Sequence, residues 1–130
     1  MRMITPRLLL ATLIAQIVCA HQQPTTLVVL DIGSEHVAMK LHVPLNELEF
    51  AFGHDVTQRS EQTLAVWGPP LKEYLIDHIR PITAAGQPWS VLVVDMSVGS
   101  ATQTQSGPFQ EVFVELSLVS PAGASLRSSF

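Results

Sequence analysis

Alternating apolar and polar residues predict a β-hairpin in the first part of the chain. Residues 25–32 (TTLVVLDI) form an unbroken run rich in β-branched side chains, which indicates a strand buried on both faces. Residues 36–43 place every second, apolar side chain on one face, which is typical of a strand with one solvated face. Gly33 and Ser34 between the two runs fit a tight turn, so the two strands are expected to pair.

Helical spacing follows this hairpin. Residues 45–52 repeat apolar side chains on one side of a helix, with Pro44 where a helix start tolerates proline and Gly53 where the helix can end. A second helical run keeps its phase up to Arg80, and Ser60 is placed to cap it. We therefore expect at least two helical segments after the second strand.

Two consecutive prolines interrupt the second helical run. Pro69 and Pro70 both lack the backbone N–H that a helix interior uses. The sequence therefore predicts either a kink at this point or two helices that meet at Gly68.

Strand patterns return in the last third of the chain. Residues 89–98 form a strong apolar strand, residues 99–107 are polar and loop-like, and residues 109–119 alternate again. Two long antiparallel strands around that loop are expected. The order of elements predicts an α+β domain: a mostly antiparallel β-sheet or sandwich with two or three helices inserted between strands 2 and 3.

The first twenty residues predict a secretory signal peptide. Arg2 and Arg7 give a positive start, an apolar run covers residues 8–18, and a small residue, Ala20, stands where a signal peptidase cleaves. The apolar run is too short for a comfortable bilayer span. We expect an exported domain over residues 21–130, in the periplasm or on the periplasmic face of the inner membrane, with an uncleaved anchor as the alternative.

Composition excludes several classes of protein. The chain has 130 residues, of which 47% are hydrophobic and 14% charged, so it is not a disordered polypeptide. A net charge of −4 without a basic cluster argues against a nucleic-acid partner. Cys19 is the single cysteine, so there are no disulfide partners and no Cys-rich metal site.

Two similar dipeptides are the candidate metal ligands. His54-Asp55 and Asp77-His78 lie on or beside the predicted helices, and folding could bring them together as an acid–base site or as a site where His54, Asp55 and His78 hold a divalent metal ion. The ordinary alternative is that these are surface histidines with common hydrogen bonds. The sequence contains no H-x-x-x-H or H-E-x-x-H motif, which would have strengthened the prediction of a metal site.

Catalytic motifs give little support for an enzyme. No serine lies in a G-x-S-x-G elbow, and the cysteine lies in the predicted leader. We therefore expect a non-enzymatic protein, with a small periplasmic hydrolase as an alternative that requires a deep polar pocket. Phe109 and Phe113 share the otherwise polar face of the last strand with Glu111 and Glu115, which indicates an interaction surface for another strand, a membrane or a protein partner.

Four segments carry a family resemblance. They are VPLNELEFAFGHDV, LKEYLIDHIRPI, GQPWSV and GPFQEVFVELSLVSPAGAS, at residues 43–56, 71–82, 86–91 and 107–125. Together they resemble the extracytoplasmic N-terminal domain of HupE/UreJ-like bacterial membrane proteins. Members of that family have a signal peptide, this domain and then several transmembrane helices, and the family name implies nickel handling.

The resemblance implies an accessory or interaction role outside the cytoplasm. The chain stops at Phe130, about ten residues after the last predicted strand and before any transmembrane helix, so we expect the domain to be incomplete at its C-terminus. No transport residue of the family can be carried over. The implied partner is a transmembrane region, either the protein's own or one that is separately encoded.

Overall fold

The first hairpin forms as the alternating pattern predicts. The computed structural model describes residues 23–122, so the predicted signal peptide over residues 1–20 and its Cys19 lie outside the described residues. Strand β1 (Leu27–Ile32) pairs antiparallel with β2 (His36–Pro44). The backbone N–H of Gly33 donates to the carbonyl of His36 at 3.0 Å and closes the turn.

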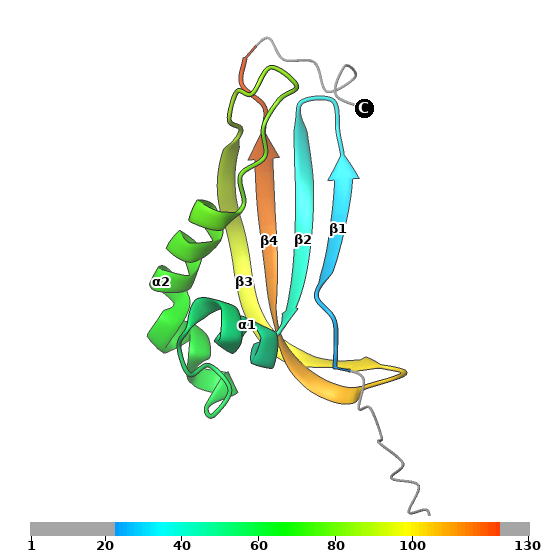
Figure 1. The fold of residues 1–130 in the computed structure, drawn as a ribbon, viewed down its shortest axis with the longest axis vertical. Coiled ribbons are helices and arrows are strands. Elements are labelled where there is room, and N and C mark those ends of the chain that lie inside the picture. Colours follow the sequence, from blue (N-terminus) through cyan, green and yellow to red (C-terminus); the bar gives the residue numbers. More distant parts are fainter. Residues whose placement is uncertain (1–22, 123–130) are drawn as a thin grey trace, which may run out of the picture.

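A second, longer hairpin completes a single antiparallel sheet. It consists of β3 (Ser90–Gln103) and β4 (Gly107–Val119), and β4 also pairs with β2, which gives the strand order β1-β2-β4-β3 (Figure 1). The α+β class and the antiparallel sheet are therefore confirmed. The sandwich alternative is wrong for the described residues, because their four strands form one sheet with the helices packed on it.

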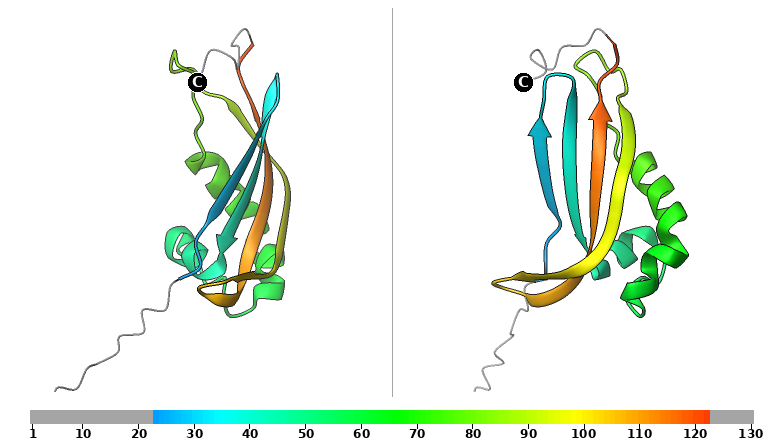
Figure 2. Two further views of the ribbon diagram at one scale, coloured as in Figure 1. Left: turned by 90° about the vertical axis from the view of Figure 1, so that its right-hand side faces the viewer. Right: turned by 180° about the vertical axis from the view of Figure 1, so that it is seen from behind.

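The predicted loop over residues 99–107 is mostly strand. Backbone pairing continues to Gln103 opposite Gly107, which leaves only residues 104–106 as the turn. Polar side chains do not prevent this, because the ladder uses backbone groups and an exposed hairpin solvates its side chains. The extended hairpin bends beneath the ends of β1 and β2 (Figures 1 and 2), where the side chain of Gln103 makes two hydrogen bonds with the backbone of Thr25.

Helix α1 (Leu45–Phe52) has the predicted bounds and ends. Pro44 is its N-cap, and Gly53 follows its last residue in the left-handed conformation, with φ of 76°. The N–H of Gly53 donates to the carbonyl of Glu49 at 2.9 Å. A glycine is needed there because a side chain strains this backbone conformation.

Helix α2 (Thr63–His78) runs unbroken through Pro69 and Pro70, so of the two predicted alternatives, a kink or two helices, the second is wrong. Proline disfavours a helical residue before it by colliding with its Cβ, and Gly68 has no Cβ. The two carbonyls that lose a helical partner, those of Ala65 and Val66, belong to exposed residues, so water can satisfy them.

The start of α2 also differs from the prediction. Ser60 begins a short 3-10 helix (Ser60–Gln62) instead of capping α2. Gln62 is the N-cap of α2, and its side chain makes no capping hydrogen bond.

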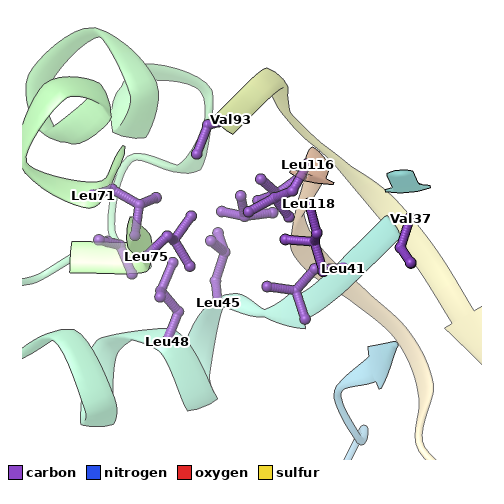
Figure 3. Close-up of a cluster of buried hydrophobic side chains, with 12 residues drawn as sticks. Val37, Leu41, Leu45, Leu48, Leu71, Leu75, Val93, Leu116 and Leu118 are labelled. Atoms are coloured by element: carbon purple, nitrogen blue, oxygen red, sulfur yellow. The ribbon is translucent and has the colours of Figure 1, made fainter. Parts of the chain in front are cut away.

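The core lies between the two helices and one face of the sheet (Figure 3). Leu45 and Leu48 of α1 meet Leu71 and Leu75 of α2, and the sheet supplies alternate residues of β4 and β2. The alternation predicted for residues 109–119 is confirmed, since every second residue of β4 from Val112 to Leu118 is buried. We call this side of the sheet the core face and the other side the open face.

Candidate interaction surface

Strand β1 exposes apolar side chains along its whole length. All six of its residues are exposed, and its five large apolar side chains keep 44–53% of their surface accessible: Leu27, Val28, Val29, Leu30 and Ile32. The prediction that this strand is buried on both faces is therefore wrong. Its apolar sequence resembles that of a central strand, but its position is the edge of the sheet.

The position of the helices explains this exposure. Helix α2 packs against β3, and α1 packs against β2 and β4. Figure 1 shows α2 beside β3, with β1 at the opposite edge of the sheet. The helical layer therefore protects the sheet mainly on the β3 and β4 side.

Half of β1 continues the core face without the cover that the core has. In the hairpin register, Val28, Leu30 and Ile32 lie opposite Leu41, Met39 and Val37. Directly opposite residues of an antiparallel pair share a face of the sheet. Leu41 and Val37 are buried, whereas their three β1 neighbours remain about half exposed. The apolar layer therefore extends one strand beyond the part that the helices protect.

Within residues 23–122, the backbone edge of β1 has little of the usual protection. Edge strands commonly carry lysine, proline or a bulge, which discourage pairing with another chain. In β1 the pairing is regular, and the only charged residue is Asp31. The opposite edge strand, β3, has a register shift between Val93 and Asp95 and carries the Asp95 charge. Of the two sheet edges in the described part of the chain, the edge of β1 is better suited to pairing with another strand.

The predicted metal ligands lie at two ends of an aromatic cluster. His54 stacks on Trp67 with ring centroids 4.2 Å apart, and His78 stacks on Tyr74 at 4.0 Å. Between the two histidines, the ring of Phe52 contacts both His54 and Tyr74 edge-on.

Each of these candidate ligands also has other partners. His78 Nδ1 lies 2.7 Å from the carbonyl of Tyr74, and an Asp55 carboxylate oxygen accepts a hydrogen bond from the Gln58 N–H. Among residues 23–122 no group of three or more His, Cys, Asp or Glu side chains could hold a metal ion. The geometry therefore gives the metal hypothesis no support, and it stays a prediction.

A cavity of about 290 Å³ lies at the start of α2. Its lining combines polar side chains with Trp67 and Val66, and it includes no histidine, serine or cysteine. The Thr63 hydroxyl in this lining donates to the carbonyl of Val56 at 2.8 Å, so it is engaged in holding the loop before α2. Asp55 also lines this cavity, but the hydrogen bonds of the Thr63 hydroxyl go to backbone carbonyls and not to that carboxylate. The cavity therefore gives the hydrolase alternative no support, and that alternative stays a prediction.

Phe109 and Phe113 are both half-buried in contacts within the chain. The Phe113 ring meets His42 edge-on at 4.8 Å, and His42 Nδ1 lies 2.9 Å from the Glu111 carboxylate. Phe109 instead lines a separate hollow of about 320 Å³ together with Leu45. The contact with His42 accounts for the Phe113 ring, and the prediction that the two rings bind a partner stays a prediction.

Comparison with protein-family models, with curated proteins and with solved structures finds no match to this chain. Within the described range, neither helix is long and apolar enough to span a bilayer.

Proposed function

We propose that this chain is a non-enzymatic, exported interaction domain that contacts another polypeptide through β1. The observation that carries this proposal is the regular, exposed and almost uncharged edge of β1. An added strand satisfies the free backbone groups of an edge and covers side chains on both faces. The three core-face side chains of β1 gain most from this cover, because they already adjoin the buried core.

The cellular setting of the proposal comes from the sequence. The predicted leader supports export, and the four resembling segments support an accessory role beside a HupE/UreJ-like membrane protein, with a link to nickel transport. Export is consistent with a domain that docks on a neighbouring polypeptide, because strand addition needs no cofactor or energy source.

Photocrosslinking in producing cells tests the proposal. A photoreactive amino acid replaces Leu30 in β1, and in a matched control it replaces Leu92 in β3. The two side chains have similar exposure, at 53% and 57%, but lie on opposite edges of the sheet. We expect a discrete protein adduct from position 30 and none from position 92. The absence of an adduct at position 30, or equal adducts at both positions, would overturn the proposal.

A further inference from the structure

We infer that the polypeptide that completes this edge is a second copy of the chain, joined by antiparallel pairing of β1 with β1 about a two-fold axis at Leu30. The inference rests on the proposed function, since it names the partner of the same edge. Two-fold dimers are the commonest closed assemblies of identical chains, and their interface must be complementary to itself. Strand β1 has this property in one particular register.

In this register, the apolar side chains on the core faces of the two copies lie next to each other. With the axis at Leu30, Leu30 lies opposite Leu30 of the partner subunit, and Val28 lies opposite Ile32 of the partner subunit. Opposite residues share a face, so the core faces of both copies lie on the same side of one continuous sheet. Six apolar side chains then adjoin across the seam, and each is about half exposed in the single chain. Pairing thus reduces the exposure of the side chains that the helices leave uncovered.

The charged side chains on the open face favour this register over those with the two-fold axis one residue away. Val29 then lies opposite Asp31 of the partner subunit, and Lys40 lies beside Val29 on β2. Lys40 and the partner's Asp31 are thus in one row, two strand spacings or roughly 10 Å apart between backbones. A lysine side chain can extend along the sheet toward that carboxylate, and the two-fold axis creates this pairing twice.

Other registers lose this charge complementarity. An axis at Asp31 places the two carboxylates directly opposite each other, which destabilises a strand pair. An axis at Val29 places Lys40 in one row with Lys40 of the partner subunit. The Leu30 register also limits the paired segment to residues 28–32, so pairing does not extend to the bent hairpin that is bonded to Thr25.

Disulfide trapping tests the register. The exported chain is purified with Cys19→Ser and Leu30→Cys, and the matched control carries Leu92→Cys instead. Opposite Cα atoms in antiparallel strands are about 4.5–5.5 Å apart, which lies within the range for a disulfide. We expect Leu30→Cys to form a covalent dimer on mild oxidation and Leu92→Cys to stay monomeric. Val28→Cys should link with Ile32→Cys when the two variants are mixed, and poorly with itself.

Measurement of mass in solution tests the dimer without cysteine. We expect the unmodified exported chain to be a dimer, Leu30→Lys to be a folded monomer by circular dichroism, and Leu92→Lys to remain a dimer. A monomeric wild-type chain at all concentrations, or dimers that persist in Leu30→Lys, would overturn the inference. If the photoadduct at position 30 in cells contains a different protein, the proposed function stands and the second copy is excluded as the partner. If no adduct forms, the proposed function itself fails.

Discussion

At the scale of single residues, Glu49 ties the end of α1 to the loop that follows it. One of its carboxylate oxygens accepts hydrogen bonds from the Thr57 hydroxyl at 2.8 Å and from the backbone N–H groups of Val56 and Thr57, both at 3.2 Å. The Thr57 hydroxyl is the main reason that the pKa of Glu49 is lowered; partial desolvation raises it, and the two backbone N–H groups lower it further. Val56, fixed by this network, is almost completely buried.

The lowered pKa predicts how stability depends on pH. Because the folded-state pKa of Glu49 is below its unfolded value, the ionised carboxylate stabilises the fold above the unfolded pKa, and this contribution is lost as pH falls through the folded pKa. We expect Glu49→Gln to lower the urea midpoint at neutral pH and to differ less from wild type in acid. Glu61→Gln, at an exposed position, is the control. A Glu49→Gln effect that is the same at every pH would contradict this account.

At the scale of elements, helix α2 contains a residue, Pro70, that disfavours helical structure. Pro70 removes the backbone N–H that would reach the carbonyl of Val66, and tertiary packing overcomes this deficit. Leu71 and Leu75 on the same helix are buried in the core. Burial of an aliphatic side chain contributes about 1.5–3 kcal/mol, which is comparable to the cost of about 3 kcal/mol for a proline inside a helix.

This balance predicts that Pro70→Ala stabilises the protein. The substitution restores a helical hydrogen bond, and Pro70 is exposed, so no packing is lost. We expect the free energy of unfolding to rise by roughly 1–3 kcal/mol, after allowance for the greater freedom of the unfolded chain. Pro88→Ala, at an exposed proline outside the helices, is the control and should show no gain. Denaturant titration measures both; an unchanged midpoint for Pro70→Ala would show that the proline does not weaken α2.

Elements with a clear period were predictable, and those decided by tertiary position were not. Residues 36–43 and 109–119 alternate on one face, and 45–52 has proline and glycine at its ends, so local chemistry fixes these elements. The run at residues 25–32 is apolar on both faces, and that pattern is the same for a central strand and an uncovered edge. Its exposure follows from where the helices pack, which no local pattern records.

The candidate site was harder to predict than the fold, for the same reason. In the sequence, the dipeptides His54-Asp55 and Asp77-His78 look equivalent. In the structure, the rings of Phe52 and Tyr74 lie between the two histidines. Side-chain stacking across α1 and α2 depends on how the helices pack. The signal for the β1 edge was present in the sequence as a strand with one acidic residue and neither lysine nor proline.

At the scale of the whole molecule, the protective core is displaced to one side of the sheet. The central strand β4 has neighbours on both sides and buries every second residue from Val112 to Leu118, while β1 buries none. Equal substitutions should therefore have unequal effects across the four strands.

This asymmetry predicts the cost of deleting leucine side chains. Leu116→Ala, at a buried position in β4, should lower the free energy of unfolding by about 2–5 kcal/mol. Leu30→Ala should cost under about 1.5 kcal/mol, since its side chain is already half exposed. Both are measured by urea titration at concentrations where the chain is monomeric. Equal losses for the two variants would mean that β1 is covered within the single chain.

The strand order has a kinetic consequence. The hairpins β1-β2 and β3-β4 each join neighbours in sequence, but the sheet closes only when β2 meets β4, across residues 45–106. Such a distant pairing must overcome a large loop-closure entropy, so it is expected to limit the folding rate. A chain that emerges with its N-terminus first presents the β1-β2 hairpin long before β4 arrives, and an isolated two-stranded hairpin is only marginally stable in water. During that interval both edges of the newly made hairpin are open, and this is when the polypeptide most needs a chaperone.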